Sequence, residues 1–208
     1  MIVTYTSIIT VTFDSDNTLP RLIQTLNRYS SIDQSNLVII NNGPAKSISD
    51  YLCTSLGYAT ATVVPYVLDR GFGAACNAGV SIAGLLPFIL LVNPDAELLE
   101  GMIDRMLSAF SANPALGIAS PQLVTHSGAH AATAGTFPSL MGLAVGKFVR
   151  PANDRRHQGS SRGTSLQQTY HSVDWVSGAV MMIRREAWDA VGGFDPNFFL
   201  YYEDIDLC

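Results

Sequence analysis

Four acidic or amide side chains stand directly after stretches of sequence that read as strands. Because the carboxyl ends of parallel strands meet at one edge of a sheet, where ligands bind in such folds, we expect these side chains to share one rim. Aspartate and asparagine are also frequent in turns and helix caps, so each residue taken alone has a structural explanation. The set together favours a ligand site. Its members are Asp14, Asn41, Asp69 and Asp95.

Asp95, in the segment Val92–Glu97 (VNPDAE), is the strongest candidate for binding a metal ion. A carboxylate at the end of a buried strand suits Mg²⁺ or Mn²⁺, which are hard cations that prefer oxygen ligands. Such a cation can bridge a diphosphate and neutralise it as a leaving group. Capping of the following helix is the structural alternative for a single aspartate.

The acidic run Tyr202–Asp206 (YEDID) stands out beside many apolar residues. If the run opens a helix, Glu203 and Asp206 share one face and Asp204 points elsewhere. The helix macrodipole favours acidic residues in a first turn, which is the structural explanation for all three. The functional interpretation makes one carboxylate a general base that accepts a proton from an attacking hydroxyl.

The glycine-rich segment Arg70–Gly79 (RGFGAACNAG) fails the dinucleotide-binding fingerprint. Cys76 occupies the position of the third glycine, and the segment follows the third expected strand instead of the first. A Rossmann dehydrogenase is therefore disfavoured. The glycines still allow the backbone to approach either a ligand or a neighbouring element closely.

The elements that must position these residues alternate along the chain. Apolar runs predict strands at Ser7–Phe13, Leu37–Ile40, Ala61–Val67, Phe88–Val92, Gly117–Ala119 and Val173–Ile183. Helical spacing predicts helices over Leu19–Leu26, from about Ser47, and over Arg70–Gly84, Met102–Phe110 and Glu186–Val191. This alternation predicts an α/β fold with a mostly parallel sheet. Residues 127–168 lack periodicity, and we expect a flexible excursion there.

Composition limits the class of protein. With 208 residues, 48% of them hydrophobic and 14% charged, the chain has the length and core of one globular domain. Its net charge of −5 argues against a nucleic-acid partner. Three cysteines without a CxxC spacing, and no apolar stretch of about 18 residues, predict a soluble, cytoplasmic domain. The four histidines, which show no metal-ligand spacing, are expected to be solvated: His126, His130, His157 and His171.

Six segments in order resemble glycosyltransferase family 2, in particular its bacterial rhamnosyltransferase-like members. They are IITVTFDSDNTL, LVIINNG, RGFGAACNAG, LVNPDAEL, VDWVSGAVMMIRREAWDAVGGFD and FFLYYEDIDLC, and they leave out roughly residues 125–172. The resemblance implies a GT-A fold, a nucleotide-sugar donor, a divalent metal and inversion at the anomeric carbon. It also implies a role in polysaccharide biosynthesis.

The same resemblance implies roles for individual residues. Asp95 takes the place of the metal-binding acid, and Asn41 that of an aspartate that reads a pyrimidine base. Asp204 takes the place of the catalytic base. The donor nucleotide is then lined by Val11, Thr12 and Phe13, with Asp69 on the same rim, and the sugars are bordered by Trp175, Ser177, Gly178 and Glu203.

Departures from the family pattern shape the remaining expectations. Asp14 replaces a usual asparagine, and Asn41 replaces the usual aspartate, so the preference for one donor base is open. The chain stops at Cys208, within a motif that the family continues, and we expect residues 1–208 to be a single GT-A domain truncated at its C-terminus.

The predicted function is an inverting transferase that uses a dTDP- or UDP-sugar, with dTDP-rhamnose as one candidate. The acceptor is expected to be a hydroxyl of a glycan or lipid-linked saccharide, reached at the inner face of the membrane by peripheral association. One alternative is a nucleotidyltransferase, which ordinarily has a basic, glycine-rich loop where this chain has Asp14–Asn17. The other is a non-catalytic family member that serves as a binding module.

Overall fold

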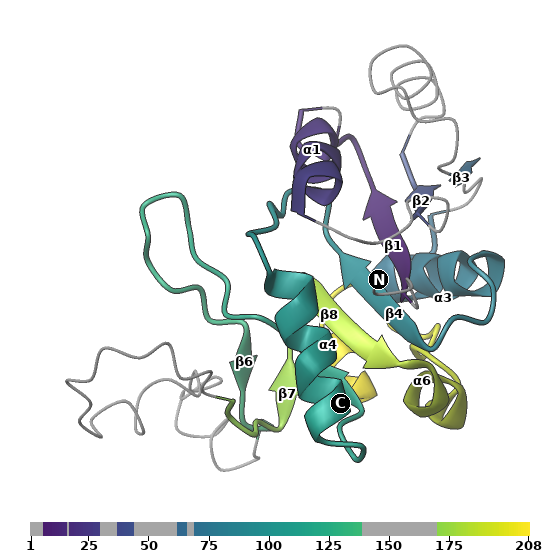
Figure 1. The fold of residues 1–208 in the computed structure, drawn as a ribbon. Coiled ribbons are helices and arrows are strands. Elements are labelled where there is room, and N and C mark those ends of the chain that lie inside the picture. The colour runs from purple at the N-terminus through teal and green to yellow at the C-terminus, as the bar shows by residue number, and fades with distance from the viewer. Residues whose placement is uncertain (1–5, 16, 30–36, 44–61, 66–68, 139–169) are drawn as a thin grey trace.

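A six-stranded sheet forms the centre of the computed structural model, which describes residues 6–15, 17–29, 37–43, 62–65, 69–138 and 170–208 (Figure 1). The strand order is β3-β2-β1-β4-β8-β5. Four strands are parallel: β1 (Thr6–Thr12), β2 (Leu37–Asn41), β3 (Thr62–Pro65) and β4 (Phe88–Val92). The fifth, β8 (Val180–Arg184), runs antiparallel to both β4 and β5 (Ile118–Ala119). The predicted α/β class with a mostly parallel sheet is confirmed.

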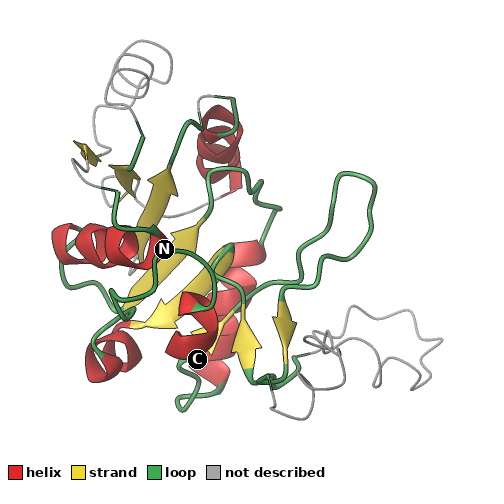
Figure 2. Cartoon of the chain, turned by 180° about the vertical axis from the view of Figure 1, so that it is seen from behind, coloured by secondary structure: helices red, strands yellow, loops and turns green. Residues whose placement is uncertain are grey.

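Two hydrophobic clusters, one on each face, hold helices against this sheet (Figure 2). Neighbouring strand residues such as Ile8 and Ile9 enter opposite clusters, because successive side chains of a strand point to opposite faces. Strands buried on both faces therefore read as continuous apolar runs. The first cluster holds α1 (Leu19–Tyr29) and α4 (Met102–Ala112); the second holds α3 (Phe72–Ile82), α6 (Arg185–Val191) and α7 (Glu203–Leu207).

The prediction of one strand over Val173–Ile183 is wrong. The segment forms two strands, β7 (Trp175–Val176) and β8, separated by a turn at Gly178. β7 leaves the main sheet and pairs with β6 (Ala134–Gly135) in a separate two-stranded sheet (Figure 1). A continuous apolar pattern shows burial, but it does not show where a strand changes its partner.

Three sequence predictions fall partly or wholly outside the described residues, among them the ends of the strand expected over Ala61–Val67. The helix expected from about Ser47 lies there, as do residues 139–169 of the expected excursion. The described part of that excursion is hydrogen-bonded: an antiparallel bridge joins Val124 to His130, and β6 follows it. Flexibility of the excursion stays a prediction.

Helix α3 packs unusually close to the sheet at Gly79. A Cβ atom added at this position would lie 2.5 Å from Cγ2 of Ile9 and 3.2 Å from Cγ1 of Ile40. Both isoleucines are buried in strands, where their branched side chains have little rotational freedom. Glycine at position 79 is therefore required by the close approach of helix and sheet.

We predict that Gly79→Ala lowers the stability of the domain. Alanine favours the helix by about 1 kcal/mol, but overpacking a close-packed core costs about 1–3 kcal/mol. Urea unfolding measures the net loss. Ser81→Ala, at an exposed position of the same helix, is the matched control and should leave stability nearly unchanged. A Gly79→Ala protein more stable than wild type contradicts the packing argument.

Candidate active site

The carboxyl ends of β1, β2 and β4 meet at one edge of the sheet. Thr12 and Asn41, the last residues of β1 and β2, are register partners, and Val92 at the end of β4 pairs with Val180 at the start of β8. The amide of Asn93 donates to the carbonyl oxygen of Ala179 at 2.8 Å. The predicted rim residues therefore lie along one edge, together with the turn that precedes β8.

On the β2 side of this edge, amide side chains fix the backbone. Asn41 is 4% exposed, and its Oδ1 accepts hydrogen bonds from the amide of Gly43 at 2.9 Å and the hydroxyl of Thr12 at 3.4 Å. Its neighbour Asn42 donates from Nδ2 to Oδ1 of Asp69 at 3.3 Å. The same oxygen accepts the amide of Gly71 at 2.9 Å. Asp69 thereby joins the end of β2 to the start of α3.

Asn42 is a residue of the same edge that the sequence analysis did not single out. Its Oδ1 is buried and has no hydrogen-bond partner among the described residues, although its Nδ2 is engaged. A buried acceptor without a donor is costly in a folded protein, and it fits a site where a ligand supplies the donor. The sequence did hold a signal for Asn42. Two successive asparagines, Asn41 and Asn42, stand where β2 ends, so both were candidates for the rim.

The three residues expected to line the nucleotide differ in exposure. Val11 packs in the second cluster, and Thr12 is fully buried. Phe13 has 62% of its surface exposed. Only Phe13 therefore presents its side chain to a ligand, while Val11 and Thr12 shape the strand beneath it.

Asp204 is held at the turn before β8. Its Oδ2 accepts the amide of Gly178 at 3.2 Å, and its Oδ1 accepts the amide of Ile205 at 2.9 Å. A Cβ atom on Gly178 would lie 3.1 Å from the ring of Phe72 and 3.8 Å from Cβ of Asp204. Glycine at 178 thus lets the turn fit between α3 and α7. Because each carboxylate oxygen can accept more than one hydrogen bond, Asp204 retains acceptor capacity.

The acidic run opens a helix as expected, but Glu203 and Asp206, three residues apart on it, differ in burial. Glu203 is 6% exposed, whereas Asp206 is exposed, and the buried face of α7 pairs Glu203 with Leu207. Packing of the short helix against α3 decides this, since Cβ of Glu203 lies 3.7 Å from a Cβ placed on Gly73. Glu203 therefore lies beneath the rim and not on the surface expected to border the acceptor.

Burial raises the pKa values of two groups beneath the rim, the Glu203 carboxyl and the Cys76 thiol. Desolvation raises the pKa of Glu203, and the neighbouring charge of Asp204 adds to this, against a backbone hydrogen bond that lowers it. Burial, followed by the charge of Glu203, raises the pKa of the Cys76 thiol well above its ordinary value. Oε2 of Glu203 has no hydrogen-bond partner among the described residues. The ionised form of Glu203 is therefore less favourable than that of an exposed glutamate.

Trp175 belongs to the two-stranded sheet beside the site, and Ser177 follows the end of β7. Trp175 is 9% exposed, and its indole nitrogen donates to the carbonyl oxygen of Thr136 at 3.1 Å. The amide of Ser177 donates to the carbonyl oxygen of Thr133 at 2.8 Å. The structure thus gives both residues a role in positioning the turn at Gly178.

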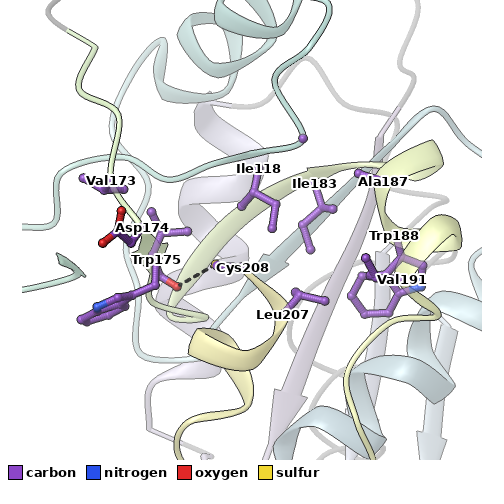
Figure 3. A pocket seen from close by; sticks show the side chains of 12 residues that line it. Ile118, Val173, Asp174, Trp175, Ile183, Ala187, Trp188, Val191, Leu207 and Cys208 are labelled. Atoms are coloured by element: carbon purple, nitrogen blue, oxygen red, sulfur yellow. Dashed lines mark hydrogen bonds between the residues drawn. The ribbon is translucent and has the colours of Figure 1, made fainter. Parts of the chain in front are cut away.

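A cavity of about 330 Å³, lined mostly by apolar residues, lies between β7, β8, α6 and α7 (Figure 3). The thiol of Cys208 donates to the carbonyl oxygen of Val176 at 3.9 Å along its wall. None of the rim residues lines this cavity, and of the other residues predicted for the site only Trp175 does. The cavity therefore lies beside the candidate active site and shares Trp175 with it.

Asp95 is exposed directly after β4. Among the described residues, no three His, Cys, Asp or Glu side chains gather into a group that could hold a metal ion. Mg²⁺ commonly binds through one or two carboxylates plus substrate phosphates and waters, without a complete protein cage. An exposed Asp95 at a ligand-binding edge fits this shared mode of coordination. None of the helices in the described ranges is long and apolar enough to cross a bilayer.

Comparison with known proteins identifies the fold and the family. The sequence model of glycosyl transferase family 2 matches residues 7–191. N-acetylglucosaminyl-diphospho-decaprenol L-rhamnosyltransferase of Mycobacterium tuberculosis is 29% identical over 161 residues, which are 72% of this chain and 52% of that protein. Rhamnosyltransferase WbbL of Escherichia coli is 50% identical over 36 residues, 17% of this chain and 14% of that one. The chain spans about half the length of the mycobacterial relative.

Solved glycosyltransferases share the fold. The mannosyltransferase PcManGT of Pyrobaculum calidifontis, in complex with GDP-Man and Mn²⁺, has a TM-score of 0.64 at 12% identity, covering 100% of this chain and 51% of that one. GalNAc-T7 with UDP, GalNAc and Mn²⁺ has a TM-score of 0.71 at 14% identity, covering 97% and 39%. The fold is thus that of a GT-A glycosyltransferase domain. The chain belongs to glycosyl transferase family 2, which confirms the resemblance seen in the sequence.

We predict that Glu203→Gln makes the domain less sensitive to rising pH. A carboxyl whose pKa is raised by folding contributes stability that is present below its unfolded pKa and lost as pH rises through the folded pKa. Glutamine does not titrate. In urea unfolding, the variant and wild type should therefore be similar at about pH 4, and the variant should be relatively more stable at about pH 7.

The matched control for this experiment is Asp206→Asn, which neutralises an exposed carboxyl on the same helix. Its stability relative to wild type should change little over the same pH interval. A Glu203→Gln protein that loses stability relative to wild type as pH rises contradicts the raised pKa of the buried Glu203 carboxyl.

Proposed function

We propose that this chain is the donor-binding and catalytic part of an inverting, metal-dependent glycosyltransferase. It transfers a sugar from a dTDP- or UDP-sugar to a hydroxyl of a glycan or lipid-linked saccharide. One observation carries the proposal: Asp204 is fixed by the amide of Gly178 beside the sheet edge that also holds Asn41 and Asp95. Membership of glycosyl transferase family 2 favours sugar transfer over nucleotidyl transfer as the activity.

The chemical step assigned to this edge is a single displacement. The acceptor oxygen forms a bond to the anomeric carbon as the bond from that carbon to the diphosphate oxygen breaks. Asp204 accepts the proton of the acceptor hydroxyl. The hydrogen bonds from Gly178 and Ile205 fix the orientation of the carboxylate before the acceptor arrives. Attack from the side opposite the leaving group inverts the anomeric carbon.

The donor nucleotide is assigned to the β1 and β2 end of the edge. Phe13 offers an exposed ring for the base, and Oδ1 of Asn42, which has no partner within the described part of the chain, offers an acceptor for a ligand N–H or O–H. Asp95 is assigned to a Mg²⁺ or Mn²⁺ ion, which when bound neutralises charge on the departing diphosphate. Both GT-A relatives described above were solved with Mn²⁺, which supports a divalent ion.

The acceptor is proposed to be a glycan or lipid-linked saccharide presented at the inner face of the cytoplasmic membrane. The name of the mycobacterial relative, an N-acetylglucosaminyl-diphospho-decaprenol L-rhamnosyltransferase, supports this class and makes dTDP-rhamnose a donor to test. Polysaccharide biosynthesis is the corresponding process.

We predict that nucleoside diphosphate binding depends on a divalent metal through Asp95. Calorimetry should show dTDP and UDP binding more tightly with Mg²⁺ or Mn²⁺ than with a chelator, and Asp95→Ala should remove that difference. Glu97→Ala is the matched control, because Glu97 lies in the same loop and makes only a 3.6 Å surface ion pair with Arg21. Equal binding in chelator contradicts the metal assignment, and tighter binding of GDP contradicts the pyrimidine assignment.

We predict that Asp204→Asn preserves donor binding but lowers the rate of transfer. An amide cannot take up the acceptor proton, and loss of a positioned base typically costs about 10²–10⁴-fold. Transfer from dTDP-rhamnose and UDP-sugars to a prenyl-linked N-acetylglucosaminyl diphosphate measures the rate. Asp206→Asn, an exposed neighbour on α7, should retain wild-type turnover. If Asp204→Asn turns over like wild type, Asp204 is not the base.

A further inference from the structure

Four consecutive large apolar side chains are exposed immediately before α7. The exposed fractions are 59% for Phe199, 50% for Leu200, 73% for Tyr201 and 51% for Tyr202. Scattered exposed apolar residues are common, but a contiguous group at a functional edge marks a binding surface. This Phe199–Tyr202 segment lies one residue from Glu203 and two from Asp204.

The backbone of the segment is unfavourable for the residues that occupy it. Tyr201 has a φ of 68° and Tyr202 a φ of 70°, both in the left-handed region. Bulky side chains rarely adopt this conformation, which suits glycine and, to a lesser degree, asparagine. Two successive tyrosines therefore occupy positions where other residues would be more stable. Strain of this kind clusters at ligand sites, where the surrounding structure maintains it.

Hydrogen bonds on both sides hold the segment in place. The carbonyl oxygen of Phe199 accepts the amide of Phe72 at 3.2 Å, and the carbonyl oxygen of Tyr202 accepts the amide of Asp206 at 2.9 Å. A Cβ atom on Gly71 would lie 1.7 Å from the Phe199 carbonyl oxygen, so the segment packs tightly on the start of α3. Its rings are exposed on an anchored backbone, which lowers the entropy lost on binding.

We propose that Tyr201 and Tyr202 form a stacking platform for a neutral sugar ring of the acceptor, which they deliver to Asp204. This inference rests on the proposed transferase function and names the acceptor-binding residues of that site. One face of a pyranose consists of C–H groups that pack on an aromatic ring, and its hydroxyl rim can hydrogen-bond to a phenol. A sugar stacked there lies next to the residue assigned as the base.

Local charge favours a neutral sugar over an anionic partner. The stretch Phe198–Cys208 contains Glu203, Asp204 and Asp206 and no Lys or Arg. An anionic membrane surface or a phosphate group is attracted by clustered cations, so this surface disfavours both. The saccharide part of a lipid-linked acceptor fits the platform better than its diphosphate or its bilayer.

The experiment separates loss of the rings from a change of backbone. At each position, Ala removes the ring and keeps the strained conformation, Gly removes the ring and relieves the strain, and Phe keeps the ring. Saturation-transfer NMR titrations of the 208-residue chain with a panel of methyl glycosides of neutral hexoses, deoxyhexoses and N-acetylhexosamines measure affinity. Leu85→Ala, which removes another exposed apolar side chain, is the control.

We expect wild type, Leu85→Ala and the Phe variants to bind the same glycoside with similar affinity. The Ala and Gly variants should both weaken it by about tenfold, the order expected for a lost stacking contact, and Gly should have the higher thermal midpoint of the two. Gly variants with wild-type affinity would show that only the backbone conformation matters and would overturn the platform. The proposal is also overturned if the wild-type chain binds no glycoside in the panel.

Two further measurements separate this inference from the proposed function. Calorimetry with dTDP and UDP tests the donor site, so a chain that binds glycosides through Tyr201 and Tyr202 but no nucleotide refutes the transferase proposal and retains the platform. Sedimentation with phosphatidylglycerol vesicles tests the membrane alternative. Vesicle binding that is lost in the Ala variants, without glycoside binding in wild type, assigns the tyrosines to lipid and overturns the proposal.

Discussion

The structure depends on the close approach between the start of α3 and the chain segment that leads into α7. The carbonyl oxygen of Phe199 occupies the space where a side chain at position 71 would begin, and it accepts the amide of Phe72. Gly71 also donates its amide to Asp69, which is bonded to Asn42 at the end of β2. One contact therefore couples the edge assigned to the nucleotide with the segment that carries Asp204. A side chain at position 71 would separate the two halves of the site.

Two further glycines extend this constraint into the rest of the fold. Gly79 lets α3 lie directly on β1 and β2, and Gly178 lets the turn before β8 fit between Phe72 and Asp204. The position of the candidate base is thus fixed by α3, which is fixed by the sheet. Since each approach depends on the absence of a Cβ atom, we expect a side chain added at Gly71, Gly79 or Gly178 to displace the carboxylate of Asp204. A displacement of that kind lowers the rate of the catalysed reaction, because catalysis by a positioned group depends on its geometry.

The sequence predicted the parts of the fold that periodicity controls and missed those that tertiary contacts control. The buried runs at β1, β2 and β4 and the face of α1 formed by Leu19, Leu22, Ile23 and Leu26 were predicted correctly, because burial on both faces or on one stripe leaves a direct pattern. The break at Gly178 was missed, since β7 and β8 are equally apolar but pair with different strands. Which carboxylate of α7 is buried was also missed, because a short acidic run gives no signal of what packs on it. The roles of the site residues stay predictions.

Adjacent carboxylates with different surroundings explain how one acidic run can serve both structure and chemistry. Glu203 lies under α3 beside Cys76, where desolvation raises the pKa of its carboxyl. Asp204 is half-buried at the rim, and both of its oxygens accept backbone amides. Helical geometry points neighbouring side chains in different directions, so anchoring Glu203 inside necessarily turns Asp204 toward the turn at Gly178. The buried residue positions the helix, and the rim residue is the one to which we assign the proton of the acceptor hydroxyl. Separation of roles by environment is how paired carboxylates divide work in other active sites, and here it follows from the packing of α7 against α3.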